Sequence, residues 1–333
     1  MEKYIEIKRT KMVDEAALGH QPMFITTSMI RFVFVFLLGT LLGNLISAIP
    51  LGIYLFTKTD FLELTLSQDI TPEQYVESVA EIFNNIPPVF TVISLLCTAG
   101  TIAAAIFYCK VFEKRKIASM GLRSGNAGAE YLVGALIGVI MYALAFVIAY
   151  ASGSVTIKMN PRGFMPIIIL FLVGYIVQGA AEELLVRGYF MISVARDYKP
   201  WIALIVSSTA FSALHAFNAG VSTIALINIF LFGIFMGIYV FKRGNIWGAC
   251  AIHSFWNFAQ GNIFGSYVSG NPIAPSVFLM EYDPARVYAN GGQFGLEGGV
   301  SATIVLVVAI GVSLLMKTKK SEISALEQSF VVE

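Results

Sequence analysis

The stretch Gln178–Phe190, QGAAEELLVRGYF, continues the apolar run PIIILFLVGYIV of residues 166–177 and carries two adjacent glutamates and an arginine. An apolar run of this kind suits a membrane-spanning helix, because a bilayer core about 30 Å thick needs about 20 apolar residues. Ionisable groups at membrane depth cost at least about 2.5 kcal/mol each, so they normally face a cavity and pair with other groups. The stretch therefore predicts a polar site inside a membrane helix.

The composition of the chain is that of a polytopic membrane protein. Of its 333 residues, 57% are hydrophobic and 13% are charged, and the mean hydropathy is +0.75. The net charge of +1 gives no sign of a nucleic-acid partner. We predict an all-α bundle of about eight transmembrane helices. The candidate spans lie near residues 27–56, 89–112, 130–151, 164–190, 200–217, 222–241, 244–264 and 299–317.

Lysine and arginine are concentrated in alternate loops of this predicted bundle. They precede the first span and follow the second, fourth, sixth and eighth, so the positive-inside rule places both termini in the cytoplasm. Lys158 and Arg162, in a loop assigned to the outer side, run against the rule. The polar N-terminal stretch shows no pattern of a removable signal peptide. Three scattered cysteines give no disulfide framework and no thiolate metal motif.

The first outer loop is predicted to contain a short helix. In TPEQYVESVAEIF, residues 71–83, Thr71 and Gln74 form a capping box and Pro72 takes the first helical position. Its apolar residues fall on one face, which either rests on the membrane surface or packs against the bundle. Packing is the simpler interpretation.

Three of the predicted spans contain ionisable or amide side chains that are unusual at membrane depth. They are Glu182, Glu183 and Arg187 in the fourth span, His215 of FSALH in the fifth, and His253 and Asn257 of HSFWN in the seventh. A spacing of four residues puts Glu183 and Arg187 on one helix face, and likewise His253 and Asn257. Glu182 lies about 100° around the helix from Glu183, so the two carboxylates are expected to have different roles.

The depths of these side chains in the membrane can be matched. If the fourth helix continues to about Arg196, Glu182 lies roughly 21 Å from its end at 1.5 Å per residue, and His215 lies equally deep in its own helix. His253 comes to roughly 14 Å. A shared site therefore predicts a fourth helix that continues past Arg187.

A carboxylate and an imidazole that converge in a partly dry cavity suit general-base activation of water. A second imidazole and a carboxamide supply hydrogen-bond donors for an oxyanion. Together they predict a hydrolase that needs no serine or cysteine nucleophile. The same atoms permit a second interpretation, a catalytic zinc site with Glu182, His215 and His253 as ligands and water in the fourth position.

Each of these residues also has a structural interpretation. Glu183 and Arg187 are most simply an intramembrane ion pair, and Asn257 alone would join two helices. Phe211 is expected to pack beside the site, and Asn218 to cap the end of a helix. A transport pathway could use the same residue types, but the sequence shows no inverted repeat.

Three motifs, in order along the chain, resemble those of a known family. EELLVR at 182–187 fits EExxxR, FSALH at 211–215 fits FxxxH, and HSFWN at 253–257 fits HxxxN. The chain resembles the CAAX proteases and bacteriocin-processing enzymes, the Abi or CPBP family, over about residues 120–264, and MGLR at 120–123 is similar to the family's lead-in.

The resemblance implies an intramembrane endopeptidase. Glu182 and His215 would activate water, and His253 and Asn257 would stabilise the oxyanion, with Glu183, Arg187 and Phe211 in support. A metal-free mechanism is favoured, because Asn257 beside His253 is better explained as a paired donor than as a neighbour of a metal, and zinc is the alternative. The substrate would be a membrane-embedded or lipidated peptide, and nothing in the sequence indicates that it is prenylated.

The expected organisation has three parts. Residues 1–119 hold an N-terminal tail, two accessory spans and an outer loop, residues 120–264 the protease-like core, and residues 265–333 a second outer loop, the last span and a cytoplasmic tail. The protein is expected to be an integral membrane protein that crosses the membrane of a bacterial cell several times. The alternative function is a noncatalytic membrane protein that uses the same polar core for bacteriocin self-immunity, binding or transport.

Overall fold

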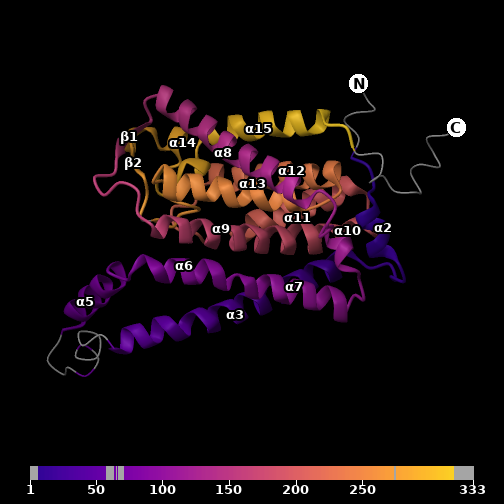
Figure 1. The fold of residues 1–333 in the computed structure, drawn as a ribbon, viewed down its shortest axis with the longest axis horizontal. Coiled ribbons are helices and arrows are strands. Elements are labelled where there is room, and N and C mark those ends of the chain that lie inside the picture. Colours follow the sequence, from indigo (N-terminus) through magenta and orange to yellow (C-terminus); the bar gives the residue numbers. More distant parts are fainter. Residues whose placement is uncertain (1–6, 58–63, 65, 67–70, 274, 319–333) are drawn as a thin grey trace.

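The protein is a mostly helical bundle in a computed structural model, which describes residues 7–57, 64, 66, 71–273 and 275–318 (Figure 1). The predicted fold class, a polytopic helical membrane bundle, is thus confirmed. Part of the predicted acidic outer loop, at 58–63 and 67–70, and the tail from 319 lie outside the described residues.

Five helices within the described residues are long and apolar enough to cross a membrane, and three shorter helices, two of them apolar throughout, complete the bundle. The long ones are α3 (Ile25–Thr57), α6 with α7 (Pro88–Val111), α8 (Ala127–Ala151), α9 to α10 (Ile167–Ala195) and α12 (Thr223–Arg243). The short ones are α11 (Pro200–Leu214), α13 (Trp247–Phe258) and α15 (Val300–Leu315). Each predicted span therefore corresponds to a helix or a pair of consecutive helices.

The second predicted span is interrupted rather than continuous. It consists of α6 (Pro88–Cys97) and α7 (Ala99–Val111), which meet at Thr98, and the hydroxyl of Thr98 donates to the carbonyl of Leu95 at 2.6 Å. The packing of α3 against this junction holds the two helices in place. A Cβ added to Gly43 of α3 would lie only 2.6 Å from the carbonyl oxygen of Cys97, so the two backbones are in direct contact.

The fourth helix is as long as the predicted site requires. It runs without a break from α9 (Ile167–Glu183) through a segment at Leu184–Met191 to α10 (Ile192–Ala195). The middle segment is π-helical, which the sequence did not predict. Runs of π-helix are rare and are found mostly at functional sites, and this one begins directly after the two glutamates.

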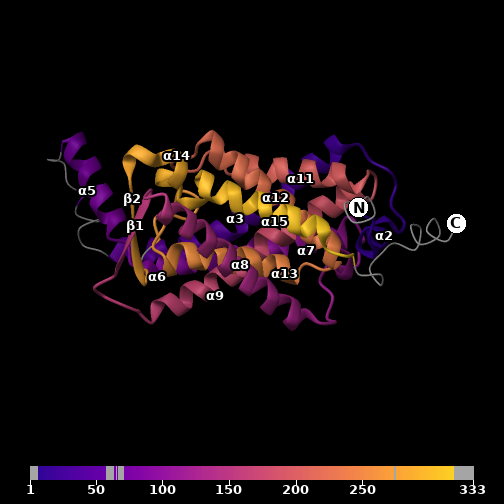
Figure 2. The same ribbon diagram turned by 90° about the horizontal axis from the view of Figure 1, so that it is seen from above.

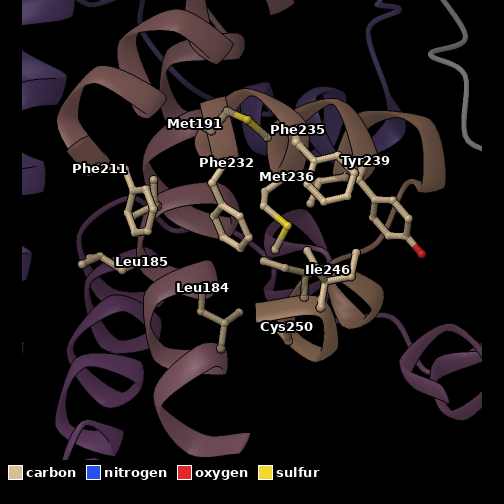
Figure 3. Close-up of a cluster of buried hydrophobic side chains, with 14 of the residues drawn as sticks. Leu184, Leu185, Met191, Phe211, Phe232, Phe235, Met236, Tyr239, Ile246 and Cys250 are labelled. Atoms are coloured by element: carbon tan, nitrogen blue, oxygen red, sulfur yellow. The ribbon is translucent and has the colours of Figure 1, made fainter. Parts of the chain in front are cut away.

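A buried apolar cluster lies between the π-helical segment, α11, α12 and α13 (Figure 3). Its members include Leu184, Leu185, Met191, Phe211, Phe232, Phe235, Met236, Tyr239, Ile246 and Cys250. On the other side of α13, the glycines Gly134 and Gly138 of α8 leave room for its backbone. Seen from above, α12 and α15 lie side by side (Figure 2), and the two helices are in contact. The helices that carry the site are thus fixed from several sides.

One end of the bundle carries a small antiparallel sheet of β1 (Val155–Met159) and β2 (Phe278–Tyr282) (Figure 1). Lys158 of β1 pairs with Glu281 of β2 at 2.8 Å. This lysine, whose position runs against the positive-inside rule, thus has an acidic partner. The segment between β2 and α15 folds into α14 (Val287–Asn290) and 3₁₀ turns at Pro284–Arg286, Gly292–Phe294 and Leu296–Gly298. Residues 265–299, which we name the outer segment, carry five of the positive-φ glycines, Gly265, Gly270, Gly291, Gly292 and Gly295, which the tight turns there require.

The short helix predicted in the first outer loop is present as α5 (Pro72–Asn84), and its capping box is confirmed. Gln74 N donates to Thr71 Oγ1 at 3.3 Å, and Thr71 N donates to Gln74 Oε1 at 3.1 Å. The interpretation that α5 packs on the bundle is wrong. The helix projects from the end of the bundle, beyond the ends of α6 and α9 (Figure 1), and none of its described side chains is buried.

At the opposite end, a buried charge cluster holds the end of the fourth helix, and we name it the Glu113 cluster. Arg196 contacts both Glu113 oxygens, at 3.1 and 3.0 Å, and Arg115 contacts Oε2 at 3.1 Å. Arg115 also donates to Ser193 of α10 at 2.8 Å. Burial alone raises the pKa of Glu113, but the two guanidinium groups outweigh it and hold that pKa below its ordinary value.

Candidate active site

The four residues predicted to be catalytic line one cavity of about 360 Å³. Glu182 comes from the last turn of α9, His215 from the end of α11, and His253 and Asn257 from successive turns of α13. The side chain of Glu182 is 32% exposed, whereas that of His253 is 6% exposed. The depths inferred from the sequence thus agree with the placement of these side chains around one space.

Glu182 is held by a residue that the sequence analysis missed. Gln178, one helical turn earlier, donates from Nε2 to Glu182 Oε1 at 2.5 Å and accepts from Asn257 Nδ2 at 3.1 Å. It therefore links the proposed base to the proposed oxyanion donor. A signal was present, because Gln178 is a polar residue inside an apolar helix and lies four positions before Glu182.

Glu183 points away from this cavity, toward Arg187 and His253. Its Oε1 lies 2.9 Å from Arg187 Nη1 and 2.9 Å from His253 Nδ1. The expected ion pair is present and both of its side chains are 0% exposed, but the contact with His253 was not predicted. Because a carboxylate only accepts hydrogen bonds, Nδ1 of His253 carries a hydrogen. The ring is turned so that Nε2 lies 3.6 Å from Glu182 Oε2.

His215 lies just past the last residue of α11, so the predicted span of 200–217 was too long. Its Nδ1 lies 2.9 Å from the carbonyl oxygen of Phe211, which can only accept, so Nδ1 carries the hydrogen and Nε2 is free to accept one. Phe211 packs between two functional side chains. Its ring centroid lies 4.9 Å from that of His215 and 4.3 Å from the guanidinium carbon of Arg187, a cation–π arrangement.

Comparison with known proteins finds a family match over part of the chain. Residues 164–259 match the family model described as type II CAAX prenyl endopeptidase Rce1-like. The match confirms the resemblance to the CAAX protease family. No curated protein matches the chain. The matched residues include α9, the π-helical segment, α11 and α13, and thus all four side chains that the sequence predicts to be catalytic. The likeness to this endopeptidase family supports a membrane peptidase.

The cavity has walls outside the matched CAAX-protease segment. Leu95 and its polar neighbours Thr91 and Ser94 come from α6, and residues 268–273 come from the segment after α13. The role predicted for Asn218 as a helix cap is wrong. Its Nδ2 donates to the carbonyl of Ser269 at 2.9 Å, because α11 has already ended at Leu214. Asn218 instead joins the end of α11 to the outer segment.

The zinc interpretation needs Glu182, His215 and His253 as joint ligands. Within the described ranges, no three histidine, cysteine or acidic side chains are placed so that they could hold a metal ion. Glu182 and His253 approach each other to 3.6 Å, but His215 does not complete a three-ligand group with them. The donor set therefore does not fit a three-ligand zinc site.

Proposed function

We propose that the protein is an intramembrane endopeptidase that hydrolyses a peptide bond with water activated by Glu182 and His215. The observation that carries this proposal is the convergence of Glu182, His215, His253 and Asn257 on one cavity, together with the match to the CAAX endopeptidase family. Water binds between the Glu182 carboxylate and Nε2 of His215, two acceptors suited to its two hydrogens.

Hydrolysis then follows from the positions of the donors and acceptors. The water oxygen attacks the carbonyl carbon of the substrate while one water proton passes to Nε2 of His215, which gives it to the amine nitrogen as the C–N bond breaks. Glu182 accepts the second water proton as the new carboxylic acid ionises, and passes it on to the amine product. Asn257 has a second amide hydrogen besides the one given to Gln178. That hydrogen is available to the oxyanion.

His253 supplies the second donor when its ring carries two hydrogens. Nδ1 donates to Glu183, and Nε2 faces Glu182 at 3.6 Å. Carboxylates on both sides stabilise the positively charged ring, and its Nε2 hydrogen can then point at the oxyanion. Arg187 fixes Glu183 from the other side, so the donor is positioned before substrate binds.

The expected substrate is a membrane-embedded or lipidated peptide, because the cavity lies among membrane helices and joins polar to apolar walls. The membrane is proposed to be that of a bacterial cell, with both chain termini in the cytoplasm. A noncatalytic role in self-immunity, binding or transport is the outcome that the experiment below must exclude.

The test uses the full chain, purified in lipid nanodiscs, and internally quenched peptides ending in a CAAX sequence, with and without a farnesyl group. Glu182→Gln keeps the shape of the side chain and removes its basicity, so cleavage is expected to fall by about 10² to 10⁴. Glu281→Gln, the same change at an exposed carboxylate of β2, is the matched control. Cleavage undiminished in Glu182→Gln, or no cleavage of either peptide by the folded wild type, contradicts the proposal.

A further inference from the structure

A second and smaller pocket lies beside the reaction cavity. Its volume is about 20 Å³, which is room for one water molecule, since a water needs about 10 to 15 Å³ by the same measure. His215, His253 and Asn257 line both spaces. The pocket also contains a carboxylate that neither the motifs nor the family match includes, that of Glu297.

Glu297 is placed in this pocket by the fold of the outer segment. Its Oε1 accepts from the backbone nitrogen of Ser269 at 2.5 Å and from the Ser269 hydroxyl at 2.8 Å. Its carbonyl accepts from Asn228 of α12 at 2.8 Å, and Asn228 is in turn held by the hydroxyl of Thr303 at 2.7 Å. Glu297 is only 8% exposed, and these hydrogen bonds hold its side chain in a fixed position within the site.

A buried, negatively charged Glu297 side chain is stabilised by a positive charge nearby. Burial raises the pKa of the Glu297 carboxyl, because an isolated carboxylate is unfavourable away from water, while the Ser269 donors and a positively charged His215 act against that rise. The carboxylate and a protonated His215 ring therefore stabilise each other. No lysine or arginine of the described residues lines this pocket.

We propose that Glu297 is a positioning residue for His215: across the small pocket, and through one water bound there, its carboxylate stabilises the positive charge that the His215 ring acquires during peptide hydrolysis. The inference rests on the proposed function. The proton comes from the attacking water and leaves with the amine product, and Glu297 itself exchanges none. The other ionisable groups around His215 are Glu182 and Tyr175 of α9, Arg187 beyond the Phe211 ring, and His253 of α13.

The experiment compares Glu297→Gln, Glu297→Asp and the control Glu281→Gln in nanodiscs with the quenched peptides. Glutamine keeps an oxygen for the Ser269 donors and removes the charge, so kcat is expected to fall about tenfold, the effect of losing one neighbouring opposite charge, with KM within about twofold. Aspartate keeps the charge and is expected to recover most of kcat. A purely structural role would instead make both variants equally poor or move KM.

A second measurement needs no substrate. The chain has three histidines, so their ring nitrogens can be labelled and followed by NMR at a fixed pH, with the His215 signals assigned from a His215→Gln sample. At a pH low enough for the wild-type ring to carry two hydrogens, the His215 signals of Glu297→Gln are expected to lie nearer those of the neutral ring, and those of Glu297→Asp to stay near wild type. Unchanged His215 signals together with unchanged kcat in Glu297→Gln overturn the inference. An active Glu182→Gln enzyme, in contrast, overturns the proposed function, so the two failures are distinct.

Discussion

Glu183 Oε1 lies 2.9 Å from His253 Nδ1, and the same oxygen lies 2.9 Å from Arg187 Nη1. One buried carboxylate therefore orients the proposed oxyanion donor and is itself fixed by a buried cation. The second glutamate of the EExxxR motif thus links two helices, α9 and α13, as well as neutralising an arginine within its own helix.

Glu183→Gln tests this link. Glutamine keeps an oxygen that can accept from Nδ1 but removes the charge that stabilises the His253 ring with two hydrogens, so the neutral ring keeps its hydrogen on Nδ1 and leaves Nε2 without one for the oxyanion. We expect kcat to fall about 10²- to 10³-fold, as for loss of one oxyanion-hole donor, with little change in KM. Peptide cleavage measured as a function of substrate concentration checks it. A change confined to KM would contradict the orienting role.

Arg187→Leu is expected to destabilise the protein by about 3 to 5 kcal/mol, because it leaves the Glu183 carboxylate buried without its arginine. The double variant Glu183→Leu, Arg187→Leu removes both charges and is expected to regain much of that stability while remaining poorly active. Thermal unfolding in nanodiscs gives the stabilities, and the cleavage assay gives the activities. Equal stability of the single and double variants would argue against the pairing.

Gln178→Leu tests the bridge between Glu182 and Asn257. Leucine has a similar size but neither accepts from Asn257 nor donates to Glu182. We expect about a tenfold loss of kcat, the size of one net hydrogen bond that orients a reacting group, and unfolding within a few degrees of wild type. Wild-type kcat in a folded Gln178→Leu variant would show that the bridge is dispensable.

The Glu113 cluster predicts a pH dependence of stability. Arg115 and Arg196 hold the pKa of Glu113 below its ordinary value in the folded state, so its contribution is fully present above the unfolded value of about 4.3 and is lost as the pH falls through the folded value. Glu113→Gln is therefore expected to unfold at lower temperature than wild type at pH 7. The difference in unfolding temperature between the two proteins should narrow below about pH 4. A difference that does not change with pH would contradict the lowered pKa of Glu113 in the folded state.

Removal of divalent metal ions is expected to leave activity unchanged, because Glu182, His215 and His253 are not arranged as joint ligands. The measurement is cleavage by protein dialysed against a chelator, together with the zinc content of the dialysed sample. Loss of activity in step with the loss of one zinc per chain, restored by zinc alone, would contradict this expectation.

Much of the fold follows from the pattern of apolar runs, since span length is set by the bilayer. The depth argument for Glu182 and His215 also led to the correct length of the fourth helix. Both results rest on periodicities that a single helix obeys by itself. The interruption at Thr98 and the π-helical turns after Glu183 could not be predicted this way, because the nearby glycines, Gly100 and Gly188, are also tolerated inside continuous helices.

The parts of the site that sequence reasoning missed are those that depend on tertiary contacts. The bond from His253 to Glu183 joins residues 70 positions apart, and Glu297 reaches the site only through the turns of the outer segment. Asn218 was given a local role because the end of α11 was placed too late. In each case the neighbour in space was remote in the chain, which no helical periodicity reveals.

The walls contributed by α6 and by residues 268–273 make the matched segment inseparable from its surroundings. If residues 164–259 were transplanted alone into another helical bundle, the four polar side chains would keep their spacing along the helices, but the cavity would lose two of its sides. Substrate preference in such proteins would then be altered more readily by exchanging α3, α6 and α7 and the outer segment than by editing the motifs themselves.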